Sequence, residues 1–93
     1  MSEIQEKQKE IEQIIDEWRE ERRIIDASKG SLPNGSTCTI RIQHSGQPFT
    51  VYFTGQACKV GFDNSNEPPR KFTWGQNDVV EKVLGYIDQL LNG

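Results

Sequence analysis

The side chains best suited to carry chemistry in this chain are two thiols and one imidazole, those of Cys38, Cys58 and His44. A zinc site of the structural type needs about four such ligands at defined spacings. One histidine and two separated cysteines do not reach that number. We therefore expect neither a metal ion nor a cofactor.

Nucleophilic catalysis by a cysteine–histidine pair is the other chemistry that these residues allow. Cys38 and His44 lie on one predicted strand, roughly 20 Å apart at ~3.3 Å per residue, so they cannot touch. Cys58 could reach His44 only if their strands were neighbours, and a buried cysteine is usually inert. A thiol-dependent enzyme using Cys58 is kept as an alternative, and we favour a protein that is not an enzyme.

Other catalytic signatures do not occur in the sequence. It contains no Gly-x-x-x-x-Gly-Lys phosphate loop and no Gly-x-Gly-x-x-Gly turn after a strand. Carboxylate pairs such as Asp16/Glu20 and Glu17/Glu21 are predicted to lie on the exposed side of a charged helix. Solvation of that helix explains these pairs better than acid–base catalysis does.

The composition of the 93 residues is that of one small acidic domain. The net charge is −3 and the pI is about 5.1, which disfavours binding to a polynucleotide or to a membrane surface. The hydrophobic content is 33%, so the core is small and self-association could add buried surface. The first residues lack the pattern of a signal peptide, so we expect none, and no apolar run approaches the ~20 residues of a membrane span. We expect a cytoplasmic protein.

The middle of the chain shows the alternation of apolar and polar residues that is typical of β-strands. Ala27–Phe62 contains no Asp or Glu, although the chain has 14 of them. Gly46 lies in the first hairpin turn, where glycine is free to take a positive φ. Lys71–Trp74 could add a short fourth strand. The three main runs are Thr37–His44, Phe49–Thr54 and Gln56–Phe62.

Both cysteines fall on the predicted inward face of this sheet. Cys38 lies on the first strand and Cys58 on the third, so their backbones are roughly 9–10 Å apart at ~4.8 Å per strand. A disulfide tolerates a Cα separation of only about 4.4–6.8 Å. We expect two free, buried thiols, which suits a reducing compartment.

Residues 1–29 are predicted to form one long helix with a heptad pattern. Such a helix would extend about 35 Å at ~1.5 Å per residue, which is longer than a small sheet needs as cover. Spacings of four and three residues alternate along one stripe, as in the seam of a coiled coil. The stripe consists of Ile4, Gln8, Ile11, Ile15, Trp18, Arg22 and Ile25.

Two interpretations of this stripe stay open. In the first, the helix lies across the sheet as ordinary core. In the second, which we favour, the half containing Trp18 and Ile25 packs on the sheet, and the N-terminal half pairs with a second copy to form a homodimer. The predicted oligomer interface consists of Ile4, Gln8, Ile11, Ile15 and Trp18.

Together these segments predict an α+β fold in a single domain of residues 1–93. The long N-terminal helix (1–29) precedes a three- to four-stranded antiparallel meander (37–74), and a C-terminal helix (78–92) follows. Both helices must bury an apolar stripe, so we place both on one face of the sheet. The stripe of the C-terminal helix consists of Val80, Val83, Leu84, Ile87, Leu90 and Leu91.

The opposite face of the sheet is predicted to carry hydroxyls, one aromatic ring and cations, without a carboxylate. Guanidinium and hydroxyl donors could hold an anion there, and Tyr52 could stack on it. The alternative is that this threonine-rich outer face is exposed to solvent and binds no ligand. The candidate binding residues are Arg41, Tyr52, Lys59 and Lys71, with Arg70 as a further donor at the mouth of the 63–70 loop.

These observations lead to a ranked hypothesis for function. We predict a non-catalytic, homo-oligomeric binding module that recognises an acidic patch on a partner protein through the cationic open face. The first alternative is a binder that sequesters a small anionic metabolite or nucleotide. A polynucleotide fits less well, because three or four cations neutralise few phosphates and the acidic N-terminal helix repels the rest of the strand.

Overall fold

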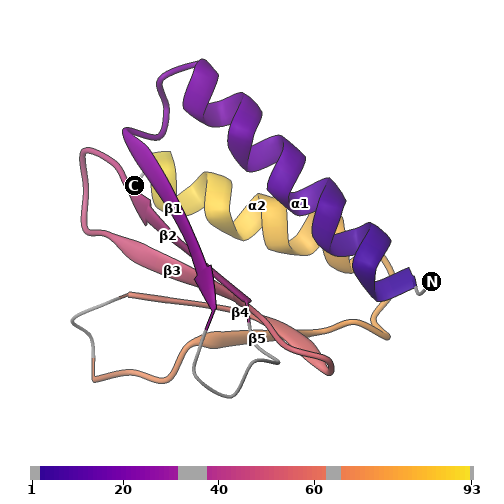
Figure 1. The fold of residues 1–93 in the computed structure, drawn as a ribbon. Helices are drawn as coiled ribbons and strands as arrows, with labels where there is room; N and C mark the ends of the chain where they lie inside the picture. The colour runs from indigo at the N-terminus through magenta and orange to yellow at the C-terminus, as the bar shows by residue number, and fades with distance from the viewer. Residues whose placement is uncertain (1–2, 32–37, 63–65, 93) are drawn as a thin grey trace.

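Two helices cover one face of a five-stranded antiparallel sheet (Figure 1). The computed structural model describes residues 3–31, 38–62 and 66–92. The predicted α+β class, the antiparallel sheet and the placement of both helices on one face are confirmed; the sheet has five strands, not three or four. In chain order the elements are α1 (Glu3–Glu20), β1 (Asp26–Ser31), β2 (Cys38–Gln43), β3 (Phe49–Phe53), β4 (Ala57–Phe62), β5 (Arg70–Thr73) and α2 (Val79–Asn92).

The sheet is a simple meander in the order β1-β2-β3-β4-β5. Its register aligns Ile40 with Val51 and Val51 with Val60, so apolar side chains of three neighbouring strands point to the same face. The helices α1 and α2 start at the same end of the sheet and run side by side in the same direction (Figure 1). The start of α1 and the end of α2 consequently lie at opposite ends of the molecule (Figure 1).

The core lies between the helices and the inner face of the sheet. Ile11 and Ile15 of α1 are fully buried, as are Val83 and Ile87 of α2. Burial of a Val, Ile or Phe side chain stabilises a fold by roughly 1.5–3 kcal/mol. The sheet contributes Ile40, Ile42, Phe49, Val51, Phe53, Cys58, Val60 and Phe72, and Ile24, Trp74 and Val79 complete this cluster.

The first helix ends earlier than the sequence predicted. We expected helix over residues 1–29, but α1 stops at Glu20. Arg22 takes a left-handed conformation with φ 67°, and its N–H bonds the Arg19 carbonyl at 3.1 Å. The Arg23 N–H bonds the Trp18 carbonyl at 2.9 Å. These two bonds form the Schellman motif that closes helices, here with arginine where glycine is usual.

Residues 26–31 form the edge strand β1 instead of the last turns of the helix. This strand pairs with β2 from Asp26 opposite Gln43 to Ser31 opposite Cys38. Ile25, predicted to pack on the sheet, is 68% exposed. Its place in the heptad pattern has no structural meaning, because the helix has already ended.

Polar contacts hold the turn after α1 to α2, and the start of α1 to the residue after β5. Arg23 forms an ion pair with Asp88 and lies with its Cζ 5.0 Å from the centre of the Trp18 ring. At the other end of α1, the Lys7 Nζ donates to the Trp74 carbonyl at 2.9 Å. These contacts fix α1 at both ends, so its position on the sheet does not depend on apolar packing alone.

The first hairpin turn needs glycine for a different reason from the one we predicted. Gly46 does not take a positive φ. A Cβ at this position would lie 2.8 Å from the His44 Cε1 atom, which is closer than packed atoms tolerate. Gly46 therefore gives the His44 ring room against the backbone.

The left-handed Arg22 gives a test of how α1 ends. An L-residue with a side chain pays about 1 kcal/mol in this conformation and glycine does not. We expect Arg22→Gly to raise the free energy of unfolding by about 1 kcal/mol in urea denaturation. Arg22→Ala removes the same charge but keeps the Cβ, so it serves as the matched control and should give no comparable gain. Equal stability of the two variants would contradict this account.

Candidate functional site

A row of side chains crosses the open face of the sheet from β2 to β5. The register places Thr39 opposite Tyr52, Tyr52 opposite Lys59 and Lys59 opposite Lys71. Side chains directly opposite one another in antiparallel strands point to the same face with Cβ atoms about 4.5–5.5 Å apart. We call these four residues the open-face row. The helices cover the other face, so the row faces away from them (Figure 1).

The open-face row contains a like-charge pair. The Lys59 and Lys71 ammonium groups rise from directly opposed positions on β4 and β5. Like charges in this position are destabilising. Lys71 is exposed and Lys59 is half-buried beside the half-buried Tyr52. An anionic group set over this pair would relieve the repulsion between the two lysines.

Arg41 belongs to the neighbouring row of the same face. It pairs with Thr50, and Thr50 pairs with Gly61. Pro69 approaches this row so closely that a Cβ on Gly61 would lie 2.8 Å from the Pro69 Cβ. Thr50 is only 8% exposed. The loop after β4 thus covers part of this second row, and the open-face row is the more accessible of the two.

The structure separates Arg70 from the other predicted binding residues. Arg70 is the first residue of β5 and pairs with Val60, so it has the parity of the inner face. Its Cζ lies 5.2 Å from the centre of the Tyr86 ring and 5.7 Å from that of Phe72. The prediction that Arg70 adds a donor to the open face is therefore wrong. The cause is that β5 begins one residue before the run that we predicted.

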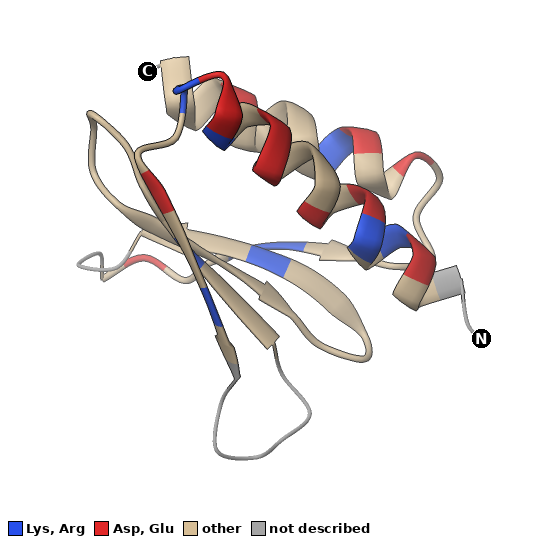
Figure 2. Ribbon diagram, turned by 45° about the horizontal axis from the view of Figure 1, so that its top comes forward, with Lys and Arg blue, Asp and Glu red and all other residues tan. Residues whose placement is uncertain are grey.

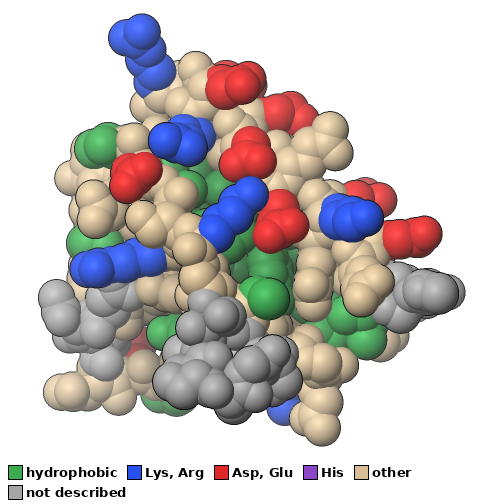
Figure 3. All heavy atoms as spheres, in the orientation of Figure 1, with side chains coloured by type: hydrophobic (Ala, Val, Ile, Leu, Met, Phe, Trp, Pro, Cys, Tyr) green, Lys and Arg blue, Asp and Glu red, His purple; other side chains and the backbone are tan. Residues whose placement is uncertain are grey.

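Charge is distributed unevenly between helices and strands (Figure 2). Strands β2 to β5 contain no Asp or Glu, whereas α1 alone carries half of the 14 acidic residues. In the space-filling view, the acidic side chains lie along α1 with Lys and Arg among them (Figure 3). Within the strands that the structure describes, the open-face row is therefore free of carboxylates.

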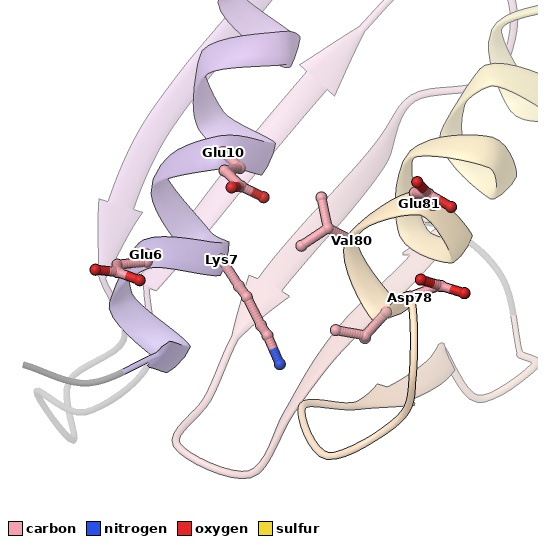
Figure 4. A pocket seen from close by; sticks show the side chains of 7 residues that line it. Glu6, Lys7, Glu10, Asp78, Val80 and Glu81 are labelled. Carbon is pink, nitrogen blue, oxygen red and sulfur yellow. The ribbon is translucent and has the colours of Figure 1, made fainter.

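A hollow of about 460 Å³ lies between the N-terminal ends of α1 and α2. Its rim carries Glu6, Glu10, Asp78 and Glu81. Figure 4 shows that Glu6 points away from the space between the helices, that Asp78 and Glu81 point away from α1, and that Lys7 reaches into the space. Over residues 3–31, 38–62 and 66–92, no three His, Cys, Asp or Glu side chains gather to hold a metal ion.

The two cysteines have different surroundings. Cys58 is fully buried, and this burial raises the pKa of its thiol from 9.0 to about 12. Cys38 is a free thiol too, but it is exposed. The prediction that both are buried is wrong for Cys38, because it is the first residue of β2 and lies at the end of the strand, where the core cluster does not cover it.

His44 is engaged by its own hairpin and does not contact Cys58. Its Nδ1 accepts from the Gly46 N–H at 3.1 Å, so Nε2 carries the proton and donates to the Gln47 carbonyl at 2.9 Å. The ring packs on Phe49, opposite Phe62. Cys58 lies four residues before Phe62 on β4, roughly 13 Å away at ~3.3 Å per residue. This separation gives no support to a thiol-dependent enzyme that uses the pair.

The residues of the predicted oligomer interface differ in how deeply the structure buries them. Ile11 and Ile15 are fully buried in the core of their own chain, so they offer no surface to a second copy. Ile4 and Trp18 are partly buried against the same core, and Gln8 is half-buried. The helix thus lies on the sheet as core, which was the first of our two interpretations.

No family model, curated protein or solved structure matches the chain. In the part of the chain that the structure describes, neither helix is both long and apolar enough to cross a bilayer. What the protein does must therefore be argued from its own surfaces.

The different burial of the two thiols predicts their reactivity. We expect 5,5′-dithiobis(2-nitrobenzoic acid) at pH 8 to modify one thiol of the native protein quickly and the second only after unfolding. Cys38 should be the fast thiol because it is exposed, and Cys58 the slow one because it is buried and protonated. Cys38→Ser should abolish the fast phase. Fast modification of this variant without denaturant would contradict the placement of Cys58.

Proposed function

We propose that the chain is a non-catalytic binding module that docks an acidic surface of a partner protein on the open-face row. The observation that carries the proposal is the register, which sets Tyr52, Lys59 and Lys71 side by side on three neighbouring strands. Tyrosine supplies rigid contact area at a low entropic cost, and the two lysines supply charge complementary to carboxylates.

The shape of the row favours a protein surface over a compact ligand. Four side chains on four neighbouring strands, each separated by ~4.8 Å, extend about 14 Å in a line. Small-molecule sites are concave and enclose most of the ligand surface. A line of side chains across an open sheet matches instead a spaced set of carboxylates. The two lysines of the row are too few for a polynucleotide, whose affinity depends on many phosphate contacts.

We make this proposal for a single chain. Ile11 and Ile15 have no surface left for the helix pairing that the heptad pattern predicted, and the core of one chain already buries them. The homodimer is therefore not needed to explain how this apolar stripe is covered.

Binding of a fluorescein-labelled decaglutamate peptide tests the row, with affinity measured by fluorescence anisotropy at low salt. We expect the double variant Lys59→Ala/Lys71→Ala to weaken binding about tenfold or more, and added salt to weaken binding to the wild type. Lys9→Ala/Arg22→Ala removes the same charge from two exposed positions, one on α1 and one in the turn after it, and should bind nearly as the wild type. Equal loss in both double variants, or no binding by the wild type, would refute the proposal.

The oligomeric state is a separate prediction. Size-exclusion chromatography with light scattering at micromolar concentration should give the mass of one chain, 10.6 kDa. A stable mass of twice this value would show that a second copy uses surface other than the buried Ile11 and Ile15. It would also restore the homodimer that the sequence predicted.

A further inference from the structure

A second cationic surface lies on the opposite side of the sheet, between β5 and α2. Four residues of α2 follow the spacing i, i+3, i+4 and i+7, so they form one stripe on the helix. Opposite this stripe stand Arg70 and Phe72 of β5, and together they enclose a hollow of about 290 Å³. The α2 stripe consists of Lys82, Gly85, Tyr86 and Gln89. We call this hollow the β5–α2 groove.

Arg70 is held in place within the β5–α2 groove. Its guanidinium lies over the faces of two aromatic rings, with Cζ 5.2 Å from the centre of Tyr86 and 5.7 Å from that of Phe72. Contact with the ring faces leaves the N–H donors at the edge of the guanidinium plane available to a ligand. The Arg70 side chain therefore loses less conformational freedom on binding an anion than a freely moving arginine would lose.

Among the residues that the structure describes, no carboxylate forms an ion pair with the cations of the groove. Arg19, Arg23 and Lys29 form ion pairs elsewhere in the protein. The cations of the groove are Arg70 and Lys82. No Asp or Glu is among the described residues that line the groove.

The remaining lining residues supply neutral polar groups and space. Tyr86 has a phenol and Gln89 an amide, and both can donate to an oxygen. A Cβ on Gly85 would meet no atom within 4 Å, so the floor of the groove is open there. A smaller hollow of about 210 Å³ adjoins it, shares Arg70 and Tyr86, and is lined in addition by Glu67.

We propose that the β5–α2 groove binds a phosphomonoester. Such a group carries about −1.5 to −2 charges at pH 7, so it matches the two cations of the groove better than a carboxylate with one charge does. The fork of Arg70 can hold two phosphate oxygens, and Lys82 supplies a point charge. Longer polyphosphates fit less well, because the adjoining hollow presents the Glu67 carboxylate.

The phosphate could come from a small phosphorylated metabolite or from a phosphorylated side chain of another protein. Both sources present the same group to Arg70 and Lys82. The Tyr86 ring lines the groove, so an aryl phosphate is the probe of choice. Phenyl phosphate represents the small ligand, and a short phosphotyrosine peptide represents the protein source.

Isothermal titration calorimetry with phenyl phosphate, with the phosphotyrosine peptide and with inorganic phosphate tests the proposal. We expect saturable binding of both aryl phosphates to the wild type, and weaker binding of inorganic phosphate. Arg70→Ala and Lys82→Ala should each reduce the affinity about tenfold or more. Arg70→Lys keeps the charge but loses the fork, so its affinity should fall between those of the wild type and Arg70→Ala.

Lys71→Ala is the matched control for these variants. It removes one positive charge from the residue next to Arg70 on the same strand, but on the open face. We expect it to leave the affinity for phenyl phosphate within about twofold of the wild type. Amide chemical shifts of Gly85 and Tyr86 should move on titration, and those of Tyr52 and Lys59 should not.

The outcomes separate this site from the open-face row. A peptide bound at least tenfold more tightly than phenyl phosphate supports a phosphorylated protein as the source, and equal affinities support a small ligand. No saturable binding of either probe to the folded wild type overturns the proposal, as does equal loss in Arg70→Ala and Lys71→Ala. Since the decaglutamate test depends on Lys59 and Lys71, either proposal can fail without the other.

Discussion

The helices cover only one face of the sheet, and the large apolar residues of the strands must point to that face. Ile40, Val51 and Val60 stand in register across β2, β3 and β4 with their side chains under the helices. A slip of one residue in any strand would turn its apolar set to solvent. The same register then forces Tyr52 and Lys59 onto the opposite face as neighbours. The binding surface is thus a consequence of how the core packs.

The sequence predicts most reliably the segments in which several buried apolar residues recur at regular spacing. The alternation in β2, β3 and β4 and the helical stripe of α2 each involve several apolar residues, so their faces follow from the pattern. The strand β1 could not be predicted this way, because Asp-Ala-Ser-Lys-Gly-Ser has no apolar alternation. The chain is free to form this edge strand because α1 ends at the left-handed Arg22. Glycine is the usual residue at such a helix end, so the arginine did not indicate that the helix stops there.

The errors at the ends of strands show how a small difference in sequence changes the chemistry of a surface. Starting β5 at Arg70, one residue earlier than predicted, assigns the guanidinium to the helix side of the sheet. Cys38 has the correct parity but lies at the end of β2 and is exposed. Parity is fixed by the residues in the middle of a strand, whereas burial also depends on how far the helices extend over the sheet. The extent of the helix cover depends on tertiary packing and cannot be read from the residues of the strand itself.

The short strand β5 contributes to both the open-face row and the β5–α2 groove, and the position of both contributions depends on the packing of one residue. Lys71 lies on the open face, and Arg70 and Phe72 lie on the helix side. Phe72 is 6% exposed, stands opposite Cys58 and has its ring centre 5.9 Å from that of Tyr86. Because Phe72 is the one buried residue of β5, its place in the core sets the register of the strand. The positions of Arg70 beside Tyr86 and of Lys71 beside Lys59 therefore both depend on the burial of this single aromatic ring.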